Sequence, residues 1–157
     1  GAMNPCPCGF LGSPQHQCRC TPDQVARYQS KLSGPLMDRI DLHVEVPALA
    51  QNELLDAPIG ESSVTIQSRC VQARARAVAR QGCTNMALQG QAIDAHIQLD
   101  ADARKFLNVA ATRMGWSARA THRALKVART IADLAGSDPI GLAHVAEAMQ
   151  YRRSALR

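Results

Sequence analysis

Helix-starting and helix-ending residues recur after residue 60, and this pattern constrains the fold more than any other feature. Ser62 or Ser63 can cap a helix that runs to about Gln81, where Gly82 ends it. Three further segments begin at Leu99–Asp100, Ser117 and Asp138–Pro139 and end near Arg113, Leu134 and Arg152. Because the connections between the segments are short, the pattern predicts four helices packed as a small bundle.

The first 47 residues follow a different pattern. Residues 4–21 contain three prolines, two glycines and four cysteines, so this stretch is expected to be a loop. Thr21-Pro22 is typical of a helix start, with a cap followed by proline in the first turn. We expect this helix to reach about Leu32, because Gly34-Pro35 then breaks it.

A single strand is predicted next. Residues 42–46 alternate between apolar and polar side chains and are followed by Pro47. The fold class expected is therefore mainly α, a four-helix bundle preceded by a partial α/β remnant with a cysteine-rich loop, one helix and one strand. The expected division is residues 1–47 as the α/β remnant, 48–61 as a linker and 62–157 as the helical domain.

The composition agrees with a helical core built from small aliphatic residues. Hydrophobic residues make up 46% of the chain but aromatic residues only 3%. No apolar run reaches the length of a membrane span and no signal peptide is visible, so the default expectation is a cytoplasmic protein without a membrane partner. Gly1 is treated as an expression remnant, and the origin of Ala2 and Met3 is left open.

The charge of the chain permits contact with nucleic acid. The net charge is +5, and with so few aromatic residues for base stacking, any DNA contact would be chiefly to phosphates. Arg69, Arg76 and Arg80 recur at spacings of seven and four, so they share one helix face, and no acidic residue lies between the first and the last. This stripe could meet DNA phosphates or a neighbouring subunit; a solvated helix face is the alternative.

Four cysteines form the clearest chemical pattern. Two Cys-x-Cys pairs are separated by a nine-residue loop, namely Cys6 with Cys8 and Cys18 with Cys20. Four thiolates that converge from two short turns suit tetrahedral zinc, although the spacing departs from the commoner Cys-x-x-Cys. His16 could replace one ligand, and four unligated thiols are the alternative. Disulfides are not expected in a cytosolic protein.

Three motifs together resemble the magnesium-chelatase-like AAA+ ATPases, in particular the ComM/YifB branch: NPCPCG, GPLMDRIDLHVEVP and SARATHRALKVARTIADLAG. The resemblance runs over nearly the whole chain but covers only the C-terminal part of that family's architecture. The sequence contains no G-x-x-x-x-G-K-[ST] phosphate-binding loop and no acidic Walker B strand before Asn4. The resemblance therefore implies part of an ATPase that completes and senses an ATP site.

The resemblance implies three site residues. Arg119 matches sensor 2, which reaches the γ-phosphate, and a basic residue at a helix start suits an anion docked there. Arg39 matches the arginine finger that acts on the ATP of a neighbouring subunit in a hexameric ring. Asn4 matches sensor 1, which orients the attacking water. The alternatives are a helix-start arginine without a role, a salt bridge of Arg39 to a nearby aspartate, and a turn residue before proline.

The function implied is a ring-forming ATPase that uses ATP and Mg²⁺ to drive DNA branch migration in recombination. The full-length protein is expected to be an ATPase and DNA helicase, whereas this chain alone is expected to be inactive. Two alternatives remain: a non-catalytic module that binds zinc and DNA, and an ATPase subunit of a magnesium chelatase. No metal-ligand spacing links the histidines outside the cysteine loop, so these are interpreted as structural: His96, His122 and His144.

Overall fold

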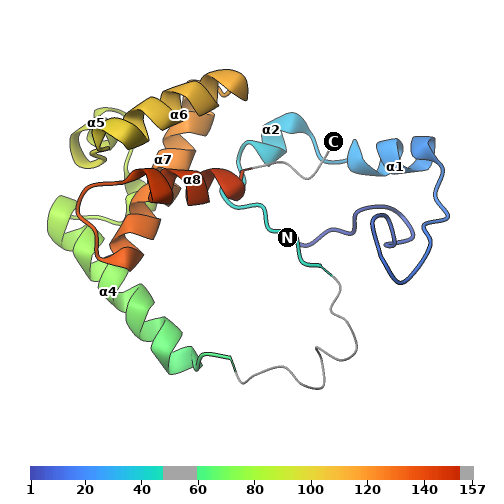
Figure 1. The fold of residues 1–157 in the computed structure, drawn as a ribbon, viewed down its shortest axis with the longest axis horizontal. Helices are drawn as coiled ribbons and strands as arrows, with labels where there is room; N and C mark the ends of the chain where they lie inside the picture. Colours follow the sequence, from blue (N-terminus) through green and yellow to red (C-terminus); the bar gives the residue numbers. More distant parts are fainter. Residues whose placement is uncertain (48–59, 153–157) are drawn as a thin grey trace. The chain divides into compact units, whose positions relative to one another are not determined.

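The computed structural model describes residues 1–47 and 60–152, and most of the linker expected at 48–61 lies outside the described residues. The described chain is mainly helical, as predicted, and contains seven α-helices and one 3₁₀-helix (Figure 1). It divides into two compact units. We call residues 1–40 and 44–47 the N-terminal unit, and residues 41–43 and 60–152 the helical unit.

The helical unit contains the four predicted helices and two short elements that the sequence pattern did not indicate. The long helices are α4 (Ser63–Gln81), α6 (Ala101–Arg113), α7 (Ala118–Ala135) and α8 (Leu142–Gln150). The additional elements are the 3₁₀-helix η1 (Asn85–Ala87) and the short helix α5 (Gln91–His96). Ser62 and Ser117 are confirmed as caps, because each side chain accepts a hydrogen bond from a first-turn amide, and Asp100 caps α6 in the same way.

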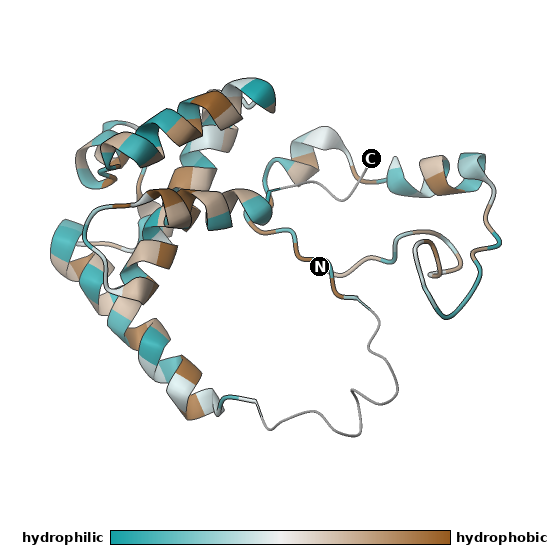
Figure 2. Cartoon of the chain, in the orientation of Figure 1, coloured by the Kyte–Doolittle hydropathy of each residue, from teal (hydrophilic) through white to brown (hydrophobic). Residues whose placement is uncertain are grey.

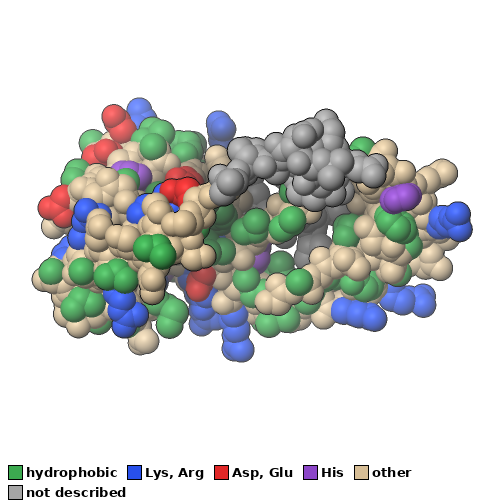
Figure 3. Space-filling view, turned by 90° about the horizontal axis from the view of Figure 1, so that it is seen from below, with side chains coloured by type: hydrophobic (Ala, Val, Ile, Leu, Met, Phe, Trp, Pro, Cys, Tyr) green, Lys and Arg blue, Asp and Glu red, His purple; other side chains and the backbone are tan. Residues whose placement is uncertain are grey.

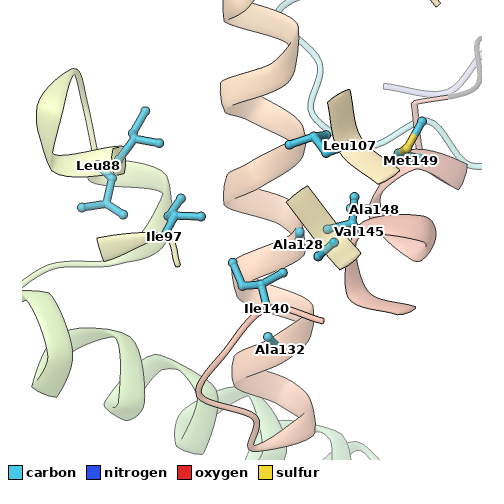
Figure 4. Packing of buried hydrophobic residues seen from close by; sticks show 11 residues of the cluster. Leu88, Ile97, Leu107, Ala128, Ala132, Ile140, Val145, Ala148 and Met149 are labelled. Carbon is cyan, nitrogen blue, oxygen red and sulfur yellow. The ribbon is translucent and has the colours of Figure 1, made fainter. Parts of the chain in front are cut away.

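The core of the helical unit lies where α7 packs against α8, α4 and η1, and where α6 packs against α8. Four alanines at successive four-residue steps make the buried line of α7: Ala120, Ala124, Ala128 and Ala132. Their small side chains let the neighbouring helices approach closely. In Figure 4, Ala128 lies near Val145 of α8, and Ala132 lies near Ile140 of the connecting loop. Figure 2 shows brown hydrophobic residues of α8 where it crosses α7.

The start of the last helix differs from the prediction. It was expected at Asp138–Pro139, but α8 begins at Leu142. Ile140 instead adopts an extended conformation and forms a parallel bridge with Leu99, and its side chain is fully buried. The bridge is closed by two backbone hydrogen bonds of 3.0 and 3.1 Å. Burial of this isoleucine therefore outweighs the local preference for a proline-led helix start.

The N-terminal unit contains α1 (Pro22–Gln29) and α2 (Gly34–Met37). The first helix begins as predicted, with Thr21 as its cap, but it ends about one turn earlier than Leu32. Gly34 and Pro35 separate the two helices but also open the second one, with Ser33 as its cap.

The predicted strand at residues 42–46 is wrong: this segment is irregular and forms no β-bridge with any described residue, although the N–H of His43 donates a 2.7 Å hydrogen bond to the carbonyl of Tyr151. A strand needs a neighbouring strand for its backbone hydrogen bonds, and side-chain alternation alone does not supply one.

Two further properties of the described residues bear on function. Among the described residues of the N-terminal unit, Cys6 is the one residue that is buried, and α1 and α2 bury none. None of the helices in the part of the chain that the structure describes has both the length and the apolar character needed to cross a membrane.

Candidate functional site

The four cysteines of the loop converge on one point. Their sulfur atoms all lie within 4.8 Å of one another. The Sγ atom of Cys6 lies 3.4 Å from that of Cys8 and 3.7 Å from that of Cys18, and the Cys8 and Cys18 sulfurs are 3.6 Å apart. All four cysteines are free, so no disulfide accounts for this arrangement. The described residues thus contain a four-thiol cluster that can hold a metal ion.

Tight turns bring the sulfurs together. The N–H of Gly9 donates a 3.0 Å hydrogen bond to the carbonyl of Cys6, which closes the turn around the first pair. Gly9 and Gly12 have φ angles of 83° and 79°, a conformation that favours glycine. Backbone N–H groups of the loop donate to the sulfurs, for example those of Phe10 and Arg19 to Cys8.

The electrostatics of the cluster favour thiolate at one position above all. The N–H donors of Phe10 and Arg19 lower the pKa of Cys8 to about 6. At Cys20, burial comes first and neighbouring sulfurs add to it, so its pKa rises to about 12. Four thiols this close cannot all ionise without a cation among them, because each thiolate opposes the next. The cluster therefore has the chemistry of a cation site that needs its cation to become fully charged.

The other proposed ligand and the remaining cysteines lie apart from the cluster. His16 packs against Phe10 instead, with ring centroids 4.9 Å apart and ring planes inclined at 57°. The four-sulfur group does not include His16. Cys70 is exposed on α4, and Cys83 is partly buried against the core of the helical unit.

Asn4, the predicted sensor 1 residue, lies beside the cysteine turn. Its side chain contacts Gly9: a Cβ atom on that glycine would lie 3.7 Å from the Asn4 amide nitrogen. The next residue, Pro5, accepts a 3.2 Å hydrogen bond from the side chain of Gln29 at the end of α1. The loop and α1 therefore both hold the backbone near Asn4.

Arg39, the predicted arginine finger, follows α2 and is exposed. Its backbone N–H donates to the carbonyl of Leu36 at 2.9 Å, so the turn after the short helix positions it. The strand predicted at residues 42–46 would have begun three residues after Arg39, whereas the structure has only a helical turn before Arg39 and no strand after it. Asp41, a suggested salt-bridge partner for Arg39, forms an ion pair of 2.6 Å with Arg123.

Arg119, the predicted sensor 2 residue, is exposed in the first turn of α7. The Ser117 side chain accepts a 3.2 Å hydrogen bond from the N–H of Ala120. The N–H groups of Ala118 and Arg119 have no hydrogen-bond partner within the described residues. An exposed arginine thus lies in the first turn of a helix whose first two amides have no acceptor within the described residues, and a helix N-terminus of this kind attracts anions.

The three arginines predicted as a DNA stripe have different environments. Arg69 forms an exposed ion pair with Glu61 at 2.7 Å. Arg76 donates to the backbone carbonyl of Asp133, and Arg80 binds both carboxylate oxygens of Asp133 at 2.7 and 3.0 Å. Two members of the stripe therefore also attach α4 to α7.

A buried polar network around Asp133 was not predicted from the sequence. The carboxylate also accepts a 2.8 Å hydrogen bond from Asn85 and pairs with Arg129 at 3.0 Å. Arg129 donates in turn to the backbone carbonyls of Ser137 and Asp138. The one available signal was the i, i+4 spacing of Arg129 and Asp133, which is common on exposed helices too.

Charge complementarity stabilises the ionised form of Asp133. Burial alone would raise its pKa, but hydrogen bonds from Arg80 and Asn85 and the charges of Arg129 and Arg80 hold the pKa below its usual value. Burial lowers the pKa of Arg129, and Asp133 partly offsets that effect. The network is therefore a charged structural element of the helical unit.

Two family models match this chain. One, described as magnesium chelatase, subunit ChlI C-terminal, matches residues 60–152. The other, described as magnesium chelatase, subunit ChlI, matches residues 1–54. The first match alone spans more than half of the chain, so the chain belongs to the magnesium-chelatase-like AAA+ family.

Comparison with individual proteins gives the branch of the family. The chain is 41% identical over 152 residues to protein YifB of Salmonella typhimurium and 40% identical over 152 residues to competence protein ComM of Haemophilus influenzae. Each alignment covers 96% of this chain and 30% of the relative. Protein YifB of Escherichia coli is 41% identical over the same length. The resemblance to the ComM/YifB type is thus confirmed, and the chain spans about a third of the length of these curated relatives.

Proposed function

We propose that this chain is the nucleotide-sensing part of a ring-forming cytoplasmic ATPase that uses ATP and Mg²⁺ to drive DNA branch migration in recombination. Family membership and similarity to competence protein ComM support this reading. The chain lacks a phosphate-binding loop, so on its own it is expected neither to bind ATP tightly nor to hydrolyse it. Catalysis would require the longer protein.

The position of Arg119 is the observation that carries the proposal. Arg119 is exposed in the first turn of α7, so its guanidinium and the first two amides of the helix would supply donors to a phosphate docked at this end. The buried alanine line of the same helix packs against α4 and α8. A contact between Arg119 and the γ-phosphate would therefore move the helices of this unit together, as a rigid body.

Arg39 and Asn4 would complete the site in the assembled ring. Phosphoryl transfer gains from positive charge on the γ-phosphate oxygens, and an arginine from a neighbouring subunit can supply it. Arg39 suits this role because it is exposed and follows a short capped helix. Asn4 would orient the attacking water through its amide, without a change of protonation.

DNA contact is proposed for the arginine stripe of α4. Figure 3 shows Lys and Arg side chains at several places on the face that it draws. Arg69 has about half of its side chain exposed, so it retains donors for a phosphate. Arg76 is also exposed, whereas the side chain of Arg80 is 20% exposed and bound to Asp133. The proposed contact therefore depends most on Arg69 and Arg76.

Hydrogen exchange of the full-length protein tests the sensing role. With a non-hydrolysable ATP analogue, the amides at the start of α7 should gain protection in the wild type and not in Arg119→Ala. Arg104→Ala is a matched control, because Arg104 is an exposed arginine on α6. Equal protection by the nucleotide in wild type and Arg119→Ala would exclude Arg119 as a nucleotide sensor.

Two other functions have some support. The family models are named after magnesium chelatase, which favours an ATPase subunit of that enzyme. The cysteine cluster favours a non-catalytic module that binds zinc and DNA. Neither explains the combination of Arg39 after a capped turn and Arg119 at a helix start. DNA-stimulated ATP hydrolysis would distinguish the motor from both alternatives.

A further inference from the structure

We propose that Cys6, Cys8, Cys18 and Cys20 bind one structural Zn²⁺ ion, and that this ion replaces an apolar core in the N-terminal unit. Zinc binding by these cysteines requires neither ATP hydrolysis nor DNA, so it can be tested separately from the proposed function.

The distances between the sulfurs fit one tetrahedral ion. A zinc–sulfur bond of about 2.3 Å in a tetrahedron requires sulfurs about 3.8 Å apart. The sulfurs of Cys6, Cys8 and Cys18 are 3.4, 3.6 and 3.7 Å apart, and no sulfur of the four is more than 4.8 Å from another. Ligands of an iron–sulfur cluster bind different iron atoms and would stand further apart. Disulfides would require sulfurs at about 2.05 Å.

The ligand set favours zinc in a structural role. Four thiolates are soft ligands, and a tetrahedral set of four sulfurs selects zinc or iron. The divalent affinity order places zinc above iron, so we assign zinc. All four positions are filled by protein, which leaves no open position for water or substrate. Backbone donors such as the N–H of Phe10, directed at the Cys8 sulfur, supply the outer shell that thiolate sites use.

The N-terminal unit needs such a centre. Its described residues bury one side chain, that of Cys6, and several large apolar side chains are at least 39% exposed: Met3, Phe10, Leu11, Leu36, Ile40, Val44 and Val46. A unit of this size without an apolar core usually depends on disulfides, a metal or a partner chain. The buried sulfur of Cys6 is the centre around which the loop is folded.

The ion would order more than its ligands. The turn from Cys6 to Gly9 supports the side chain of Asn4, and Pro5 is hydrogen bonded to Gln29 of α1. Loss of the metal should therefore loosen residues 4–20 and the end of α1 together. The helical unit has its own core and should not respond.

Metal analysis of the 157-residue chain, purified without a metal-affinity step, is the first test. About one zinc per chain is expected, and Co²⁺ exchanged into the site should show the absorption of a tetrahedral thiolate complex. Iron in place of zinc, or a metal-free chain that protects residues 4–20 from hydrogen exchange as well as the zinc-loaded chain, would overturn the proposal.

Cysteine variants give the second test. Cys18→Ser should reduce bound zinc at least several-fold and speed hydrogen exchange in residues 4–20, with exchange in α7 unchanged. Cys70→Ser is the control, since Cys70 is an exposed free cysteine outside the cluster. Cys83→Ser controls for loss of a partly buried thiol. Equal zinc content in Cys18→Ser and the two controls would contradict the assigned ligand set.

Discussion

Arg129 and Asp133 form an ion pair of 3.0 Å one turn apart on α7, and each residue is only 1% exposed. Arg80 of α4 and Asn85 of η1 bind the same carboxylate. Asp133 thus connects three elements of the helical unit through one side chain. A buried ion pair is not in itself a strong source of stability, but removing one partner leaves the other charge buried and unpaired.

Asp133→Ala should therefore destabilise the helical unit strongly. The variant leaves Arg129 with a buried charge and also removes the acceptor for Arg80 and Asn85. We expect the free energy of unfolding to fall by about 3–5 kcal/mol. Urea unfolding of the 157-residue chain, followed by helical circular dichroism, measures this change.

Glu61→Ala is the control for that experiment. It also removes one carboxylate from an ion pair, but Glu61 and Arg69 are both about half exposed. Exposed pairs contribute about 0–1 kcal/mol, so the urea midpoint should change little. Similar losses of stability in Asp133→Ala and Glu61→Ala would show that the buried network contributes no more to the free energy of unfolding than an exposed ion pair.

The pH dependence of stability should carry a contribution from Asp133. Its pKa in the folded chain lies below the unfolded value, because Arg80, Asn85 and Arg129 outweigh the effect of burial. This stabilisation is complete above the unfolded pKa of about 4 and is lost as the pH falls through the folded pKa. Urea unfolding between about pH 6 and pH 2 should therefore show a steeper acid loss for wild type than for Asp133→Asn. Parallel curves for the two proteins would contradict this assignment.

The sequence predicted those elements whose ends are set by local chemistry. Ser62 and Ser117 cap α4 and α7, and Gly82 and Gly136 end them with φ angles of 73° and 70°. These signals act within one helical turn, so they can be recognised without knowledge of the tertiary structure. The start of α8 could not be predicted, because Ile140 is held by a bridge to Leu99, which lies 41 positions earlier in the chain.

The candidate sites also contain features that could be predicted from local sequence and features that could not. Convergence of the cysteines was predictable because close spacing and turn residues bring the pairs together. The burial of Arg129 and Asp133 could not be predicted, because charged residues are usually exposed. These two are enclosed only by the packing of α4 and η1 against α7. The segment 42–46 alternates like a strand, but pairing depends on a partner that the described residues do not provide.

DNA binding by the stripe of α4 can be separated from its structural contacts. Arg69→Ala should weaken binding of the 157-residue chain to DNA and reduce the salt dependence of log K by about one unit, because one phosphate contact is lost. Its urea midpoint should stay unchanged, since Arg69 forms only an exposed ion pair. Fluorescence anisotropy at several salt concentrations measures the effect.

Two variants control for that result. Arg80→Ala should lower the urea midpoint as well, because Arg80 binds Asp133. Arg104→Ala, on the exposed surface of α6, should leave DNA affinity as it is. Equal DNA affinity and salt dependence in wild type and Arg69→Ala would exclude Arg69 from the DNA contact.

ATP hydrolysis by the full-length protein, with and without branched DNA, tests the central claim most directly. The wild type should hydrolyse ATP faster with DNA, and Arg39→Ala should lose about a thousand-fold or more of this activity while it still binds ATP. Arg104→Ala should behave like the wild type. Hydrolysis that responds neither to DNA nor to Arg39→Ala would contradict both the motor function and the arginine finger.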